Sequence, residues 1–144
     1  MKAKFFKCNH CGNIVVKFVD SGVTPFCCGE AMTELVPQTA DGNYEKHLPV
    51  IIHAESEEMR ATGNANLERA KSCVELKVQV GSVEHPMTPE HHIEFVYLET
   101  QEGGQLVQLP RNGKPTATFC VCKCTPTAVY EYCNLHGLWK TSIM

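Results

Sequence analysis

Four cysteines within residues 1–37 are the feature that most constrains how this chain can fold. Cys8 and Cys11 form a CxxC pair, and the adjacent pair Cys27-Cys28 follows after fifteen further residues. A segment of this length cannot bury enough apolar surface to fold alone, so a bound metal ion is the expected staple. Tetrahedral sulfur coordination suits iron or zinc. The sequence therefore predicts a metal-stapled module over residues 1–37, with all four cysteines as ligands.

The adjacent cysteines place a demand on the backbone. Consecutive side chains of an extended strand point in opposite directions, so Cys27 and Cys28 can bind one ion only if the chain bends there. Gly29 would ease that bend. Residues 14–19, with the sequence IVVKFV, predict a short strand between the two pairs. The alternative, four reduced core thiols, fits poorly in a module with so little core.

The composition describes a globular chain in a reducing compartment. At 144 residues, it could form one domain or a small module joined to a domain of about 100 residues. No apolar run approaches the roughly 20 residues of a membrane span, and residues 1–7 are not followed by the apolar region of a signal peptide. We expect a cytoplasmic protein without membrane contact, in which nine cysteines indicate metal ligation or redox chemistry rather than a disulfide framework.

The charge of the chain limits its partners. A formal net charge of −3 excludes a broad nucleic-acid-binding surface. Residues 1–37 carry four Lys against three acidic residues, a net +1, whereas residues 38–144 carry nine Lys or Arg against thirteen acidic residues, a net −4. If the larger part handles an anionic substrate, a local positive group must attract it.

The chain after residue 37 changes character. Residues 38–44 are polar and contain a turn-forming Asp-Gly-Asn, which predicts a linker. Over residues 45–144, short strands are separated by turn signals and no long helix is convincing, which predicts an all-β antiparallel sandwich. Residues 73–80 alternate strictly between apolar and polar, as a half-buried strand does. Further strands are expected over residues 93–99, 105–109, 116–124, 127–132 and 138–143.

Two segments of the larger part do not follow the strand pattern. Residues 54–72 contain few apolar residues and are interpreted as an exposed insertion able to form short helical turns. The segment around His47 is predicted to be extended, because Pro49 follows it closely and proline disfavours helix in the residue before it.

One cysteine and four histidines could form a second metal site. Cys133 and His136 lie three residues apart on a turn closed by a glycine. His85 and His91 lie at the two ends of a loop whose prolines forbid regular structure, and His47 stands far earlier in the chain. Thiolate and imidazole suit borderline first-row metals. Considered alone, the turn with Cys133 and His136 is equally typical of structural zinc.

These motifs resemble those of a known family. The CxxC pair with Cys27-Cys28-Gly29 resembles the desulforedoxin module. The remaining motifs resemble those of superoxide reductases: Glu45-Lys46-His47, His85-Pro86-Met87 with His91, and Cys133-Asn134-Leu135-His136-Gly137. Their order and the joining of the two modules are similar to the two-iron form of these enzymes, desulfoferrodoxin, over nearly the whole chain.

The resemblance implies a site and a reaction. In this family four histidine nitrogens surround a ferrous ion in a plane, a cysteine sulfur binds axially, and one axial position stays open. The ligands here would be His47, His85, His91 and His136, with Cys133 axial. The implied reaction is the one-electron reduction of superoxide to hydrogen peroxide, which removes superoxide under oxidative stress. The thiolate would push electron density through the iron, as in thiolate-ligated haem enzymes.

The resemblance also implies partners and architecture. The implied catalytic domain, residues 45–144, is an immunoglobulin-like sandwich with its iron at an exposed edge. The family is usually homodimeric, with the small module contributing to the contact. A second iron, or zinc in a recombinant sample, would be bound by Cys8, Cys11, Cys27 and Cys28. Rubredoxin or a similar small carrier is the expected electron donor.

Lys46 is the local positive group that the charge distribution requires. Near the open position, its ammonium group would attract superoxide and stabilise developing negative charge. The resemblance implies that Glu45 occupies the sixth position once the iron is ferric. The alternative for both residues is a solvated surface pair.

The chain departs from the family pattern between His47 and His85. Their spacing is longer than is typical, and residues 54–72 account for the excess, so this insertion could reshape the rim of the site. His53 is a rival ligand to His47 but lacks the preceding Glu-Lys and the closely following proline. His92 should point away from His91 if a strand has begun there, which predicts a place at the surface or behind the ligands.

Cys120, Cys122 and Cys124 are not part of the family pattern. Alternation places them on one face of a strand, and we interpret them as small buried thiols in the sandwich core. A further metal or redox site that includes Cys73 is the alternative. For the whole chain, the alternative function is a non-catalytic iron- or zinc-binding electron-transfer protein.

Overall fold

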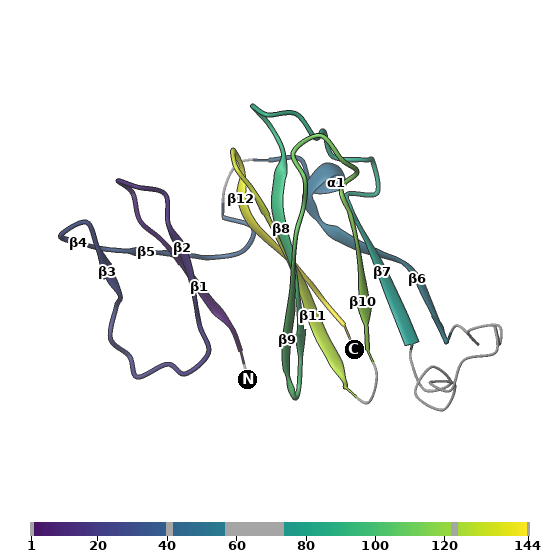
Figure 1. Ribbon diagram of the computed structural model, residues 1–144, viewed down its shortest axis with the longest axis horizontal. Helices are drawn as coiled ribbons and strands as arrows, with labels where there is room; N and C mark the ends of the chain where they lie inside the picture. Colours follow the sequence, from purple (N-terminus) through teal and green to yellow (C-terminus); the bar gives the residue numbers. More distant parts are fainter. Residues whose placement is uncertain (1, 40–41, 57–73, 122–123, 144) are drawn as a thin grey trace.

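The first part of the molecule is a small unit built on strands (Figure 1). The computed structural model describes residues 2–39, 42–56, 74–121 and 124–143. Three antiparallel strands have the order β2-β1-β5, and a short hairpin pairs β3 with β4. These strands are β1 (Lys4–Lys7), β2 (Ile14–Lys17), β3 (Phe26–Cys27), β4 (Glu30–Ala31) and β5 (Thr33–Leu35).

The larger part is a sandwich of two antiparallel sheets, which confirms the predicted all-β fold. One sheet has the order β10-β7-β6 and the other the order β12-β11-β8-β9. The first is formed by β6 (Pro49–Ser56), β7 (Val74–Val80) and β10 (Thr116–Cys120). The second is formed by β8 (Ile93–Thr100), β9 (Gly103–Gln108), β11 (Pro126–Cys133) and β12 (Gly137–Ser142).

The main core lies between these two sheets. Leu76 and Val78 of β7 are buried and alternate with polar residues, as predicted for this strand. They pack with Ile93 and Leu98 of β8 and with Phe119 of β10. A strand period of two thus sends one side chain in every pair to the interior.

The four-stranded sheet is also buried on its other face. There Phe95, Tyr97 and Tyr130 are buried and form a second core with Phe5 of β1. The centroid of the Phe5 ring lies 5.8, 5.5 and 5.2 Å from those of the three aromatic rings, respectively. The small unit therefore packs directly on the outer face of the sandwich.

The segment before β6 differs from the prediction of extended chain. Residues Tyr44–His47 form a single helical turn, α1. Asn43 caps this turn, because its side-chain oxygen accepts the N–H of Glu45 at 2.8 Å. Pro49 restricts only the residue before it, Leu48, which is extended with ψ 124°. The helical turn therefore fits between the cap and the proline.

The predicted insertion over residues 54–72 falls largely outside the described residues. Its first residues, through Ser56, continue β6 rather than beginning a helical turn. Across the described part of the chain, no helix has the length and apolar character needed to cross a membrane.

The prediction of buried thiols on β10 was wrong for Cys120. This residue is exposed and disulfide-bonded. The alternation has the opposite phase, because the larger apolar side chain of Phe119 takes the interior position. Cys124 is a partly buried free thiol that packs against the main core. Cys73 and Cys122 lie outside the described residues.

Candidate metal centres

Four separate segments bring the predicted histidines to one end of the sandwich. His47 ends α1, His85 lies in the loop after β7, and His91 lies just before β8. Cys133 is the last residue of β11, and His136 follows in the tight turn to β12. This turn is possible because Gly137 has a φ of 75°, which favours glycine.

The four imidazole rings form a nearly square arrangement. The ring centroids of His47 and His85 are 4.8 Å apart, those of His85 and His91 4.6 Å, those of His91 and His136 5.1 Å, and those of His136 and His47 4.7 Å. The diagonal from His47 to His91 is longer, at 6.4 Å. The two histidines of this diagonal thus face each other across a centre that all four surround.

Backbone carbonyls fix the orientation of two of these rings. The Nδ1 of His47 lies 2.7 Å from the carbonyl oxygen of Asn43, and the Nδ1 of His85 lies 2.7 Å from that of Pro86. An Nδ1–H donated to each carbonyl leaves each Nε2 with a lone pair for a metal.

Nitrogen spacing in the square fits a metal ion. The two Nε2 atoms of His47 and His85 lie 3.2 Å apart. Metal–nitrogen bonds of about 2.1 Å that meet at a right angle would place their nitrogens about 3 Å apart. The Nε2 of His91 is buried and has no hydrogen-bond partner in the described structure. A metal ion at the centre would satisfy this otherwise unpaired atom.

Cys133, at the end of β11, completes the group. Its thiol is buried, and its Sγ lies 3.7 Å from the Nδ1 of His136. The ligand atoms of His47, His91, Cys133 and His136 all lie within 4.8 Å of one another. His85 falls outside that mutual limit, but its contact with His47 and its place in the square put it beside the same centre.

Burial favours the neutral form of three of the imidazoles, those of His47, His85 and His91. It lowers the pKa of His47 and of His91, and it lowers the pKa of His85 to about 4. Burial also raises the pKa of the Cys133 thiol. Neutral imidazoles are ready to bind a metal, whereas the thiol must release its proton when the metal arrives.

Trp139 supports the site, although the sequence reasoning did not single it out. Its ring is stacked on that of His47 with centroids 4.9 Å apart, and its Nε1–H donates to the carbonyl of His136 at 3.0 Å. A Cβ at Gly42 would lie 2.8 Å from the Trp139 ring. In the sequence, the hint of this role was that the single tryptophan lies three residues after His136.

His92 lies behind the ligands rather than at the surface. It is buried, with its Nε2 2.7 Å from a carboxylate oxygen of Glu94 and its Nδ1 2.9 Å from the carbonyl of Thr88. The backbone N–H of His92 donates to the side-chain oxygen of Asn134 at 2.9 Å. The bond to Asn134 joins the segment next to His91 to the turn of Cys133.

Glu131 is a buried acid that the sequence reasoning also missed. It lies two residues before Cys133 on β11, and neither carboxyl oxygen has a hydrogen-bond partner in the described structure. Burial raises its pKa well above the ordinary value, so the carboxyl group is neutral. Its neighbours Tyr130 and Tyr132 lie in the second core, so strand alternation places Glu131 on the opposite face of the sheet.

Lys46 and Glu45 are exposed on α1, next to His47. The positive charge of Lys46 lies close enough to the histidines to contribute, after burial, to the lowered pKa of both His47 and His91. The carbonyl of Glu45 accepts the N–H of Val83 at 3.0 Å, which joins α1 to the loop of His85.

The four N-terminal cysteines form the other group. The sulfur atoms of Cys8, Cys11, Cys27 and Cys28 all lie within 4.8 Å of one another. The chain bends between the adjacent cysteines as predicted, because Cys28 has a φ of 54° and Gly29 a φ of 74°.

The electrostatics of this group favour a cation. Backbone hydrogen bonds from Cys11 and His10 lower the pKa of Cys8 to about 6. The neighbouring thiols, chiefly Cys11, raise the pKa of Cys28 to about 12. The first thiolate forms readily, but the fourth forms only when a positive ion offsets the others.

Comparison with known proteins agrees with both groups. The family model described as Desulfoferrodoxin matches residues 39–142, and that described as Desulfoferrodoxin, N-terminal domain matches residues 1–35. The desulfoferrodoxin of Nitratidesulfovibrio vulgaris is 39% identical over 137 residues, which cover 95% of this chain and 94% of the relative. The superoxide reductase of Pyrococcus horikoshii is 32% identical and covers 74% of this chain and 92% of the relative.

A solved structure extends this similarity to the fold. The superoxide reductase from Treponema pallidum matches with a TM-score of 0.71 and 34% identity, covering 99% of this chain and 100% of that one. The fold is thus a small desulforedoxin-like module followed by an immunoglobulin-like antiparallel sandwich. With both family models matched in order along nearly its whole length, the chain belongs to the desulfoferrodoxin family.

Proposed function

We propose that this chain is a superoxide reductase whose catalytic iron is held by His47, His85, His91, His136 and Cys133. The observation that carries the proposal is the square of four imidazoles with a buried thiol beside it. Related proteins of known name and similar fold are superoxide reductases. The enzyme acts as an oxidoreductase on superoxide and releases hydrogen peroxide.

The donor set accounts for the chemistry. Iron held by these residues would supply the single electron that superoxide requires. The four imidazoles would hold the iron, and carbonyls fix the Nδ1 atoms of His47 and His85 so that each Nε2 is free to bind it. Cys133 would bind the iron as a thiolate and supply electron density to it. The buried setting of Cys133 keeps water away from this sulfur.

Lys46 attracts the anionic substrate in this proposal. It is exposed on α1, while its charge acts on His47 and His91. A cation at the mouth of the site draws superoxide in and stabilises negative charge as the electron arrives. Glu45, its exposed neighbour, would serve as a further ligand to the iron in its ferric state.

The four-cysteine group would hold the second iron. An electron donor such as rubredoxin is supported by exposed apolar side chains next to the histidine ligands. Tyr44, Val83 and Leu135 are 56%, 48% and 60% exposed, and each lies within three residues of a histidine ligand. Such a rim would suit a small carrier that binds briefly.

The small module also carries exposed apolar side chains. Phe18, Val19, Val23 and Phe26 are among them, and a second copy of the chain could cover them in a homodimer. Cys120 is disulfide-bonded, but all the cysteines of both metal groups are free, which suits a reducing compartment, so we place the protein in the cytoplasm.

Pulse-generated superoxide tests the proposed function directly. Protein loaded with iron and fully reduced should consume superoxide, and hydrogen peroxide should appear in equal amount. The Cys133→Ser variant, which keeps the size of the side chain but loses the soft sulfur ligand, should lose this activity. Iron-loaded wild-type protein that leaves superoxide unconsumed would instead support a non-catalytic electron-transfer protein.

A further inference from the structure

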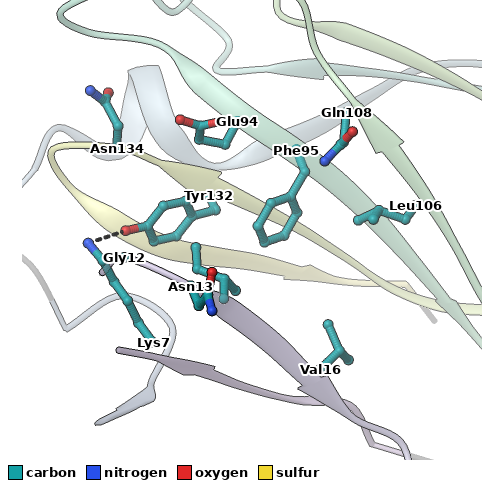
Figure 2. A pocket seen from close by; sticks show the side chains of 11 residues that line it. Lys7, Gly12, Asn13, Val16, Glu94, Phe95, Leu106, Gln108, Tyr132 and Asn134 are labelled. Carbon is teal, nitrogen blue, oxygen red and sulfur yellow. Dashed lines mark hydrogen bonds between the residues drawn. The ribbon is translucent and has the colours of Figure 1, made fainter. Parts of the chain in front are cut away.

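A hydrogen bond links the two parts of the molecule close to both metal groups. It joins the residue just before Cys8 to the residue just before Cys133. Lys7 ends β1 and is followed by Cys8, whereas Tyr132 is followed by Cys133. The Lys7 ammonium donates to the Tyr132 hydroxyl at 2.9 Å, as Figure 2 shows. From Cys8 to Cys133 the connection therefore runs through the peptide bond to Lys7, the whole Lys7 side chain, this hydrogen bond, the whole Tyr132 side chain and the peptide bond to Cys133.

Packing holds both ends of this connection in place. Tyr132 is only 5% exposed, and its ring is stacked on Phe95 with centroids 5.7 Å apart and planes inclined by 13°. Phe95 is stacked in turn on Phe5, two residues before Lys7 on β1. The Lys7 ammonium also lies 5.7 Å from the centre of the Tyr132 ring, a cation–π contact. The hydrogen bond is thus part of a rigid contact between β1 and the sandwich.

A cleft lies beside this contact. It has a volume of about 410 Å³ and lies between the small module and the four-stranded sheet (Figure 2). Asn13, whose side-chain N–H₂ donates to the Cys27 sulfur at 3.8 Å, lines one wall. Asn134, which follows Cys133, lines the cleft as well. Electron transfer weakens less steeply along bonded atoms than across an open gap, so the Lys7–Tyr132 contact is the favoured path.

We propose that Lys7 and Tyr132 form the route by which an electron passes, within one chain, from the four-cysteine group to the histidine–cysteine group. This inference rests on the proposed function and its two iron ions. One electron moves: ferrous iron at the four cysteines is oxidised to ferric, and ferric iron at the histidines is reduced to ferrous. No bond forms or breaks and no proton is needed, because Lys7 and Tyr132 keep theirs.

The test follows electron movement rather than superoxide turnover. A one-electron radical pulse, given in less than stoichiometric amount to fully oxidised di-iron protein, should first bleach the four-cysteine absorption. That absorption should then recover as the ferric absorption of the other centre falls. The second phase should be first-order, with a rate constant independent of protein concentration.

Two variants and a matched control identify the route. Lys7→Met removes the donor, and Tyr132→Phe keeps the ring but removes the hydroxyl, so each should slow the first-order phase several-fold. Lys4→Met, on the same strand but paired with Asp20 instead, should leave it unchanged. Unchanged absorption spectra and melting temperatures would show that both centres remain folded.

Three outcomes would overturn the proposal. They are a wild-type rate in both Lys7→Met and Tyr132→Phe, a rate proportional to protein concentration, and no transfer between the centres. Failure of the proposed function is observed separately, as failure of the fully reduced protein to consume superoxide.

Discussion

The Nε2 atoms of His47 and His85 lie 3.2 Å apart, each with its Nδ1 held by a backbone carbonyl. Two lone pairs directed at one point repel each other unless a cation lies between them. The chain fixes this arrangement through short local contacts: the carbonyl of Asn43 for one ring and that of Pro86 for the other. The metal site is therefore largely formed by the fold, and substitutions that disturb these supports should be measurable through metal binding.

The cap of α1 should matter for both stability and metal affinity. Asn43→Ala removes the side-chain oxygen that accepts the N–H of Glu45, and loss of such a cap costs about 1 kcal/mol. Because α1 also positions His47, the variant should bind iron more weakly. Chemical denaturation and iron titration measure the two effects. Asn43→Asp, which keeps an acceptor, is the control, and equal iron affinity in all three proteins would contradict this role.

Gly42 should be needed for the support that Trp139 gives to His47. An added Cβ would lie 2.8 Å from the Trp139 ring and 3.4 Å from the His47 ring, so Gly42→Ala must displace one of them. We expect lower iron occupancy and a shifted iron–thiolate absorption band, measured by metal analysis and visible spectroscopy. Gly12→Ala adds the same methyl group in open space, although it is strained by its φ of 79°, and should affect only the module. A Gly42→Ala protein with wild-type occupancy and spectrum would refute the expectation.

Lys46 should accelerate the encounter with superoxide. Lys46→Met should lower the second-order rate constant several-fold and weaken its dependence on ionic strength, because a local attraction has been removed. Lys46→Arg keeps the charge and should retain most of the rate. Lys114→Met removes an exposed lysine elsewhere and serves as the control for net charge. Pulse radiolysis over a series of salt concentrations makes the measurement, and superimposable curves for Lys46→Met and wild type would exclude the role.

Tyr130 should make stability depend on alkaline pH. Burial, with the nearby Glu99 carboxylate, raises its pKa above the ordinary value of about 10. As pH rises past that value the unfolded chain loses the phenol proton while the folded protein keeps it, so the free energy of unfolding falls. Unfolding curves measured between about pH 8 and pH 11 should therefore show wild type losing stability relative to Tyr130→Phe. The exposed Tyr44→Phe should run parallel to wild type. If Tyr130→Phe also runs parallel, the buried phenol has no such effect.

Much of the fold and of the metal site could be predicted from local sequence patterns. The alternation in β7 and the spacing of Cys133 and His136 both report on neighbours in the chain, and both correspond to what the structure shows. The sandwich also followed, since short strands with turn signals leave few other folds. The bend at Cys28 followed from the need of two adjacent thiols to face one ion.

The structural features that were not predicted depend on contacts that local sequence patterns do not reveal. The helical turn at Tyr44–His47 was missed because Asn43 caps it, and the nearby proline suggested extended chain instead. The stacking of Trp139 on His47 joins residues far apart in sequence. On β10, alternation was correct but its phase was not, because Phe119 competes with Cys120 for the interior.

The aromatic outer face of the four-stranded sheet sets a condition on any shortened form of this protein. Phe95, Tyr97, Tyr130 and Tyr132 are shielded from water only while Phe5 and its strand cover them. A truncated chain beginning at residue 38 would expose them as one contiguous aromatic surface and would tend to self-associate. A catalytic domain engineered to work alone would need polar side chains at these four positions before its activity could be compared with that of the full-length enzyme.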